Sequence, residues 1–182
     1  MGITCKKPVV NKHRKAPNGD TVKKPTVYIE TSFISYVTSR LSNDYLVSAH
    51  QRVSRDWWER RRNFFNLCIS QLVIDEISAG DKEESSKRNQ LVIGLRELRA
   101  TPEALNLAKS FIEQGALPKK AFDDALHMAL AAVNGMDYLL TWNCKHIANV
   151  EVIHVIVEVC EESEYKPPLI CTPLEIGGAS DD

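Results

Sequence analysis

The chain has 182 residues, of which 43% are hydrophobic and 26% are charged, as in one ordinary globular domain. The net charge of −1 hides an uneven distribution, because residues 1–24 contain seven Lys or Arg and one Asp, which leaves −7 for residues 25–182. An acidic body is a poor general binder of nucleic acid. Any nucleic-acid contact must therefore come from a local patch, the basic segment or bound cations.

The cysteines and the hydrophobic runs exclude several classes of protein. The five cysteines are an odd number without a CxxC pair, which argues against a zinc ribbon and against a disulfide framework. No apolar run approaches the roughly 18 residues of a membrane span, and the basic N-terminus lacks the apolar stretch of a signal peptide. We therefore expect a cytoplasmic protein with no membrane partner.

Composition divides the chain into three parts. Residues 1–24 combine prolines, an Asn-Gly pair and many lysines without periodicity, so we expect a flexible basic arm. This arm is either a solvated extension or a segment that contacts RNA. Residues 25–176 are the expected single domain, and residues 177–182 are an expected disordered tail.

The domain is expected to open with a buried strand at residues 26–29, TVYI. Glu30 ends this strand, and either Thr31 or Ser32 can cap the segment FISYVTSRL that follows. Glu30 is thereby placed at the carboxyl end of a strand, where open α/β sheets build their sites.

A long helix is expected to start at residues 43–44 and to run through DYLVSAHQRVSRDWWERRRNFF. It carries five arginines, among them Arg55 and Arg62, beside Trp57 and Trp58. Basic side chains interleaved with indoles can bind RNA through phosphate pairing and stacking, so we assign Arg55 and Arg62 to substrate binding. Two other interpretations stay open: the indoles pack inward with the arginines in solvent, or the helix offers a groove to a partner helix.

A second strand at residues 67–69 leads into another helix, QLVIDEISAG, with Ser70 as a candidate N-cap. Glu76 lies close to the apolar stripe of this helix, whereas Asp75 lies on its margin. Glu76 is therefore the better candidate for a site. Residues 81–90, DKEESSKRNQ, are a highly charged loop or the start of a helix.

The stretch 123–147, DDALHMALAAVNGMDYLLTWNCKHI, holds two more candidates. It predicts an amphipathic helix, a turn at Gly135, and a short strand at residues 138–141 that ends near the polar Asn143. Asp in a first helical turn is ordinary, since it complements exposed N–H groups, but Asp124 shares the helical spacing of the buried face. A carboxylate there, beside the polar end of a strand, suits a metal site with oxygen ligands.

The remaining elements complete an α/β pattern. Thr101-Pro102 start a helix that stops at Gly115, residues 147–162 can form a helix or a strand, and residues 169–172 form a short last strand. The predicted order is β-α-β-α-α-α-β-(α)-β. Strands separated by helices predict a mainly parallel sheet with helices on both faces.

Four polar residues are expected to meet at the carboxyl edge of this sheet: Glu30, Glu76, Asp124 and Asn143. Mg²⁺ and Mn²⁺ bind carboxylate and amide oxygens, and several acids would not gather in a partly buried site without cations. Two such ions roughly 4 Å apart can activate a water and stabilise the leaving oxygen of a phosphodiester. The four residues are thus predicted metal ligands and catalytic residues.

In their order and spacing, VYIETSFISYV, ISQLVIDEIS, DDALHMALAA and DYLLTWNCKHIAN resemble the PIN-domain nucleases, and within them the VapC-type toxins. The resemblance covers about residues 26–175 and implies a three-layer α/β fold whose central, mainly parallel sheet is flanked by helices. It also implies a metal-dependent endoribonuclease with an RNA substrate, a homodimer and, for the toxins, an antitoxin partner.

The resemblance carries the family's acidic quartet onto this chain at Glu30, Glu76, Asp124 and Asn143, and a Thr near the fourth position onto Thr141, which we assign to substrate. Two positions depart from the family. Glu30 replaces an Asp and shifts its carboxylate by about 1 Å, and Asn143 replaces an Asp and removes one negative charge.

Two other hypotheses follow from these departures and from the absence of other motifs. A PIN-like module that binds RNA or a partner protein without cleaving RNA is the main alternative. A different phosphate-handling α/β enzyme is the third, and it is disfavoured because the chain has no GxxxxGK[ST] loop or GxGxxG turn. His127 is expected to be a packed residue or to support a ligand, since a hard-ion site does not call for imidazole.

Overall fold

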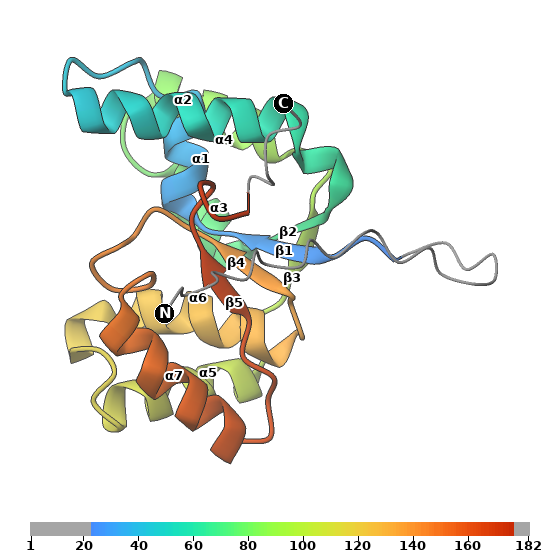
Figure 1. The fold of residues 1–182 in the computed structure, drawn as a ribbon, viewed down its shortest axis with the longest axis vertical. Coiled ribbons are helices and arrows are strands. Elements are labelled where there is room, and N and C mark those ends of the chain that lie inside the picture. Colours follow the sequence, from blue (N-terminus) through green and yellow to red (C-terminus); the bar gives the residue numbers. More distant parts are fainter. Residues whose placement is uncertain (1–22, 177–182) are drawn as a thin grey trace, which may run out of the picture.

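A computed structural model describes residues 23–176 of the chain. Most of the predicted basic arm and the predicted tail at residues 177–182 lie outside the described residues. Within them the chain folds around one parallel sheet (Figure 1). None of the helices between residues 23 and 176 is long and apolar enough to cross a membrane.

The sheet has five strands in the order β3-β2-β1-β4-β5, and all neighbouring strands are parallel. The strands are β1 (Thr26–Ile29), β2 (Asn66–Ser70), β3 (Arg96–Leu98), β4 (Tyr138–Leu140) and β5 (Leu169–Cys171). β1 lies at the centre, where Tyr28 pairs with Cys68 of β2 and with Leu139 of β4. The carboxyl ends of all five strands therefore lie at one edge of the sheet.

Helices cover both faces of the sheet (Figure 1). The helices are α1 (Thr31–Thr38), α2 (Tyr45–Arg60), α3 (Gln71–Ser78), α4 (Lys82–Val92), α5 (Pro102–Glu113), α6 (Phe122–Val133) and α7 (Val150–Glu162), with 3₁₀ turns η1 (Arg62–Phe64) and η2 (Lys119–Ala121). α1 packs against α2, α3 and α4, whereas α5 packs against α6 and α7. The predicted three-layer α/β fold, with a parallel sheet flanked by helices, is confirmed.

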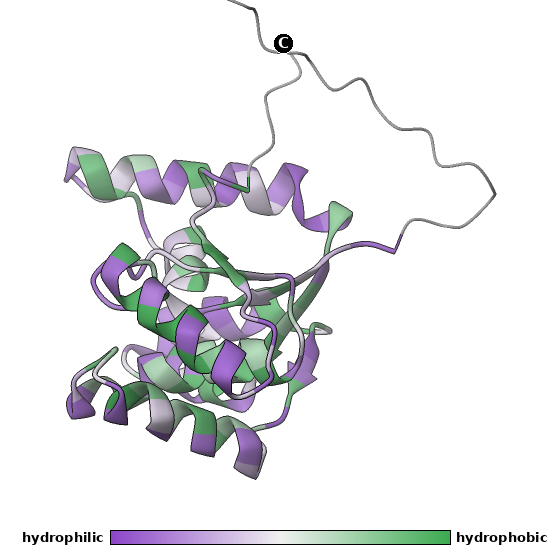
Figure 2. Cartoon of the chain, turned by 60° about the horizontal axis from the view of Figure 1, so that its bottom comes forward, coloured by the Kyte–Doolittle hydropathy of each residue, from purple (hydrophilic) through white to green (hydrophobic). Residues whose placement is uncertain are grey.

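The core lies between β1 and the helices that cover it. Val27, Tyr28 and Ile29 are completely buried, and α6 contributes eight consecutive buried residues from Ala125 to Ala132. Along the outer helices, hydrophilic and hydrophobic residues alternate (Figure 2), as expected of helices with one face on the core. α6 is therefore an interior helix, and the polar groups that it carries must find partners inside the protein.

Helix starts follow the sequence predictions with one exception. Three residues at predicted helix starts accept hydrogen bonds from backbone N–H groups: Asp44 from Val47, Ser70 from Val73, and Thr101 from Ala104. The prediction that Thr31 or Ser32 caps the following segment is wrong. α1 already begins at Thr31, so Glu30 occupies the N-cap position, and its side chain makes no cap bond. The hydroxyls of Thr31 and Ser32 do not cap the helix because they donate to the carboxylates of Glu76 and Glu30.

The predicted element order misses two features. β3 was not predicted, because it is a three-residue strand at the edge of the sheet with Arg96 and Glu97 exposed, so it has no hydrophobic pattern. The predicted order also has one helix between the first two strands, where the structure has α1 and α2. The two alternatives are resolved in favour of helices: residues 82–92 form α4, and residues 150–162 form α7 with Asn149 as the N-cap.

Candidate active site

Glu30 is a buried carboxylate directly after the central strand. Its side chain is 6% exposed, and its Oε2 accepts hydrogen bonds from Thr141 Oγ1 at 2.7 Å and from Ser32 Oγ. The backbone N–H of Glu30 donates to the carbonyl of Leu140 at 3.1 Å, which fixes the residue against β4. No Lys or Arg of residues 23–176 forms an ion pair with Glu30. A buried carboxylate without a cationic neighbour is costly.

Glu76 brings a second carboxylate to this edge from α3. Its Oε2 accepts hydrogen bonds from His127 Nε2 at 3.0 Å and from Thr31 Oγ1. Burial alone acts to raise the pKa of Glu76, but the hydrogen bond and charge of His127, together with the bond from Thr31, outweigh it and lower this pKa. Glu76 is therefore an ionised ligand candidate at neutral pH.

His127 supports Glu76 from the buried face of α6. The ring is 1% exposed, and its Nδ1 lies 2.8 Å from the hydroxyl of Tyr28, which in turn lies 2.7 Å from Ser70 Oγ. Burial raises the pKa of Tyr28, so this hydroxyl keeps its proton. Because both ring nitrogens of His127 already have partners, the histidine orients Glu76, in agreement with the prediction of a packed or supporting residue.

The carboxylates of Glu30 and Glu76 are close enough to share a cation. Ligand atoms of Glu30, Glu76 and His127 all lie within 4.8 Å of one another. These three residues come from β1, α3 and α6, and only the parallel sheet brings those elements to one edge.

Asp124 and Asn143 form the neighbouring part of the site, together with His146. Asp124 lies in the first turn of α6, where its Oδ1 accepts a hydrogen bond from Asn143 Nδ2 at 2.8 Å and its Oδ2 lies 2.7 Å from His146 Nδ1. The Asn143 amide accepts a bond from the His146 backbone N–H at 3.1 Å. Since a carboxylate only accepts and an N–H only donates, this network fixes the orientation of the amide.

Thr141 connects the two parts. Its side chain is fully buried, and its Oγ1 donates to Glu30 Oε2 at 2.7 Å and accepts a bond from the Asn143 backbone N–H at 2.9 Å. The structure therefore brings all four predicted ligands, and Thr141 with them, to the carboxyl ends of β1 and β4. Thr141 acts on its neighbours in the protein, and its predicted contact with substrate stays a prediction.

The donor set fits a hard divalent cation. Glu30, Glu76 and Asp124 offer carboxylate oxygens and Asn143 offers an amide oxygen, which are the ligands that Mg²⁺ and Mn²⁺ prefer. The ion pairs that the carboxylates form within residues 23–176 are with histidines, His127 for Glu76 and His146 for Asp124. The negative charge gathered here is thus not matched by a fixed positive charge from Lys or Arg.

Comparison with solved structures identifies the fold. VapC20 of Mycobacterium tuberculosis, a toxin that cleaves the sarcin-ricin loop, superimposes with a TM-score of 0.53 and 14% identity, over 68% of this chain and 95% of that chain. The chain has the fold of a VapC-type PIN domain. VapBC2 of Rickettsia felis, bound to a promoter DNA fragment, is similar over 81% of this chain and 98% of that chain, with a TM-score of 0.48 and 15% identity. No protein-family model and no curated protein matches the sequence.

The two arginines assigned to substrate lie elsewhere in the PIN fold. Arg55 donates from Nε to the carbonyl of Val37 at 3.0 Å and from Nη2 to the carbonyl of Ser39, so it binds the end of α1 opposite to Glu30. The Arg62 guanidinium lies 5.0 Å from the centre of the Trp58 ring, near the start of β2. Neither is brought to the carboxylates, and their contact with substrate stays a prediction.

Sequence reasoning missed the groups that hold the carboxylates in this PIN fold. The sequence predicts Thr31 or Ser32 as a cap and Tyr28 as a plain strand residue, and it predicts no partner for His146. One signal was available for Tyr28: a phenol hydroxyl inside a strand that is buried on both faces needs a hydrogen-bond partner. The partners themselves depend on tertiary contacts.

Proposed function

We propose that this protein is a divalent-metal-dependent endoribonuclease that hydrolyses RNA phosphodiesters, and that it is the toxin of a toxin–antitoxin pair. The observation that carries the proposal is the pair of carboxylates Glu30 and Glu76, whose ligand atoms lie within 4.8 Å of each other and of His127, at the carboxyl edge of a PIN fold and without a Lys or Arg partner among residues 23–176. A third carboxylate, Asp124, is connected to Glu30 through Asn143 and Thr141. The shared fold with a toxin that cleaves the sarcin-ricin loop supports RNA as the substrate.

Mg²⁺ or Mn²⁺ would be held by the three carboxylates and by the amide of Asn143. When bound, such an ion activates a water and stabilises developing negative charge on phosphate oxygens. The chain itself supplies orientation, because each carboxylate is held by short side chains: Glu30 by Thr141 and Ser32, Glu76 by His127 and Thr31, and Asp124 by Asn143 and His146. Ligands fixed in this way do not have to be ordered when the cation or the RNA arrives.

His146 is placed to handle a proton. The carboxylate of Asp124 accepts a hydrogen bond from Nδ1, so the ring is fixed in one orientation and Nε2 is the nitrogen left to contact a substrate oxygen. The ring is 22% exposed, so solvent can reach it.

The test is cleavage of a mixed RNA panel by the full chain with Mn²⁺, with EDTA, and with an Asp124→Asn variant. We expect cleavage only with Mn²⁺ and with Asp124 intact. Asp123→Asn is the matched control, because Asp123 is the exposed neighbour in the same helical turn. Equal loss of activity in both variants, or activity retained by a folded Asp124→Asn protein, would contradict the assigned role.

A non-cleaving PIN module that binds RNA or a partner is the second candidate. One observation favours it: both oxygens of Asp124 already accept hydrogen bonds, and Asn143 turns its N–H₂ group toward that carboxylate. Isothermal titration with Mn²⁺ separates the two candidates. The nuclease must bind Mn²⁺ in a way that Asp124→Asn and Glu76→Gln weaken, whereas the silent module shows no such binding.

We further propose a homodimer and an antitoxin partner. Two large hydrophobic residues at the start of α2 support a protein interface, because Tyr45 is 94% exposed and Leu46 is 66% exposed. Light scattering on the full chain, with Tyr45→Ser and Leu46→Ser variants, tests the homodimer. The cysteines of residues 23–176 are free thiols, which supports our proposal of a cytoplasmic location.

A further inference from the structure

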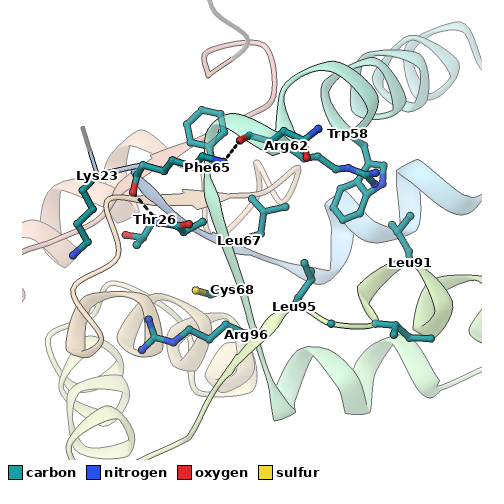
Figure 3. Close-up of a pocket in the computed structure, with 15 residues that line it drawn as sticks. Lys23, Thr26, Trp58, Arg62, Phe65, Leu67, Cys68, Leu91, Leu95 and Arg96 are labelled. Atoms are coloured by element: carbon teal, nitrogen blue, oxygen red, sulfur yellow. Dashed lines mark hydrogen bonds between the residues drawn. The ribbon is translucent and has the colours of Figure 1, made fainter. Parts of the chain in front are cut away.

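A basic pocket lies at the edge of the sheet opposite to the carboxylates, where the strands begin (Figure 3). Its volume is about 660 Å³, within the range of ligand pockets. The residues that line it include four cations and no acid: Lys23, Lys24, Arg62 and Arg96. Lys23 and Lys24 belong to the basic segment, whereas Arg62 and Arg96 come from residues 25–182, which carry a net charge of −7.

None of the four cations is paired with an acid of residues 23–176. Lys24 donates to the carbonyl of Asn63 at 2.6 Å, which holds its ammonium in place but leaves its charge. Lys23 and Arg96 lie on the same side of the pocket (Figure 3). The pocket thus has room and charge for a ligand with more than one negative group.

The floor of the pocket is apolar and aromatic. Phe65 and Leu67 are half-buried and line the pocket together with Leu95. The Phe65 ring is fixed by stacking on Trp57, with centroids 5.6 Å apart and planes at 23°, and by an edge contact with Tyr138. Apolar and aromatic surface beside cations is the kind of surface that binds bases and phosphates of single strands.

We propose that this pocket binds single-stranded RNA, with phosphates beside Lys23, Arg62 and Arg96 and an unpaired base against Phe65. The strand must be single, because a base within a duplex cannot reach an aromatic ring. The choice of RNA among nucleotide-containing anions rests on the proposed function.

The pocket and the carboxylate site can be altered independently. Thr26, which lines the pocket, and Ile29, which precedes Glu30, are the two ends of β1, so roughly 10 Å of strand separates the two edges. The protein therefore presents acidic ligands at one edge and free cations at the other.

Binding of a fluorescent 12-nucleotide RNA to the full chain, measured by anisotropy in EDTA, tests the proposal without cleavage. The test variant is Arg62→Gln with Arg96→Gln. The matched control is Lys82→Gln with Lys109→Gln, which removes two exposed positive charges. Neither lysine lines this pocket or takes part in an ion pair of residues 23–176. Thermal melting checks that both variants fold.

The expected loss follows from counterion release. Each phosphate contact contributes about 0.7 to the salt slope of single-strand binding, which at 0.15 M salt is about fourfold in affinity. The test variant should therefore bind the RNA about 14-fold more weakly than wild type, and its slope of log affinity against log salt should be smaller by about 1.4. The control should keep the wild-type affinity and slope. Equal losses in test and control, or no RNA binding by the wild type, would overturn the proposal.

Competition identifies the source of the nucleotide. Unlabelled single-stranded RNA should displace the probe, whereas duplex RNA of equal length should not; displacement by adenosine triphosphate at equal concentration would assign the pocket to a free nucleotide and overturn the RNA proposal. Cleavage and binding are read separately. RNA binding that depends on the pocket, without metal-dependent cleavage, would refute the nuclease proposal and support the pocket proposal. Metal-dependent cleavage with an RNA affinity that the pocket variant does not change would support the nuclease proposal and refute the pocket proposal.

Discussion

Thr141→Val is the substitution that tests most directly whether the hydroxyl network holds the site together. Valine has nearly the same shape as threonine, so no cavity forms, but Glu30 loses its 2.7 Å donor and the N–H of Asn143 loses its 2.9 Å acceptor. A hydrogen bond to a charged group is worth about 1.5–3 kcal/mol and a neutral one about 0.5–1.5 kcal/mol. The free energy of unfolding should therefore fall by about 3 kcal/mol.

Thermal and urea unfolding measure this loss. At about 2–4 °C per kcal/mol for a domain of this size, Tm should fall by about 6–12 °C. Thr141→Ser is the matched control, since it keeps the hydroxyl and removes one buried methyl group at a cost of about 1 kcal/mol. Metal-dependent RNA cleavage should fall about 10–100-fold in Thr141→Val, as for other residues that position metal ligands, and stay near the wild-type rate in Thr141→Ser.

The hydroxyl network has no such role if the two Thr141 variants unfold at the same temperature. Equal activity in both variants would likewise show that Glu30 does not need its threonine donor. A lower Tm in Thr141→Val with unchanged cleavage would assign Thr141 to folding alone.

Three further predictions concern other parts of the fold. Two hydrogen bonds from Thr26, the first residue of β1, lower the pKa of Asp137, so Asp137→Ala should lower the free energy of unfolding by about 1 kcal/mol at pH 7. This difference from wild type should shrink below pH about 4, because the wild-type carboxylate becomes protonated there. Urea midpoints at pH 7, 5 and 3 measure the difference. Tyr28→Phe leaves His127 Nδ1 without its partner and should cost about 1–3 kcal/mol in urea unfolding, and an unchanged midpoint would contradict the network. Burial raises the pKa of Cys160 to about 12. Iodoacetamide at pH 8 should therefore label the exposed Cys144 and leave Cys160 unlabelled until urea unfolds the protein, and mass spectrometry of the peptides measures both.

The parts of the fold that local chemistry determines were predictable. Ser70 and Thr101 cap their helices because each has a side-chain oxygen placed before an apolar periodic run. Glu30 and Asn143 follow short hydrophobic strands, and parallel strands end at a common edge, so their proximity followed from the element order. The position of Asp124 followed from helical spacing alone.

The rest depended on contacts that no local pattern encodes. β3 acquires its structure by pairing with β2, since its own three residues carry no alternation. Thr31 has the local sequence pattern of a helix cap, but its hydroxyl instead donates a hydrogen bond to Glu76, 45 residues away. The basic pocket was also out of reach, because Lys23, Arg62 and Arg96 become neighbours only when β1, β2 and β3 align.

The placement of β1 between β2 and β4 has a consequence for synthesis of the protein. Glu30 and its partner Thr141 are 111 residues apart in the chain, and a ribosome that adds about 5–20 residues per second takes about 6–22 s to travel between them. In the later part of that interval the nascent chain contains Glu30 and Glu76 but lacks β4 and Asn143. The complete set of proposed ligands therefore exists only after most of the domain has been made.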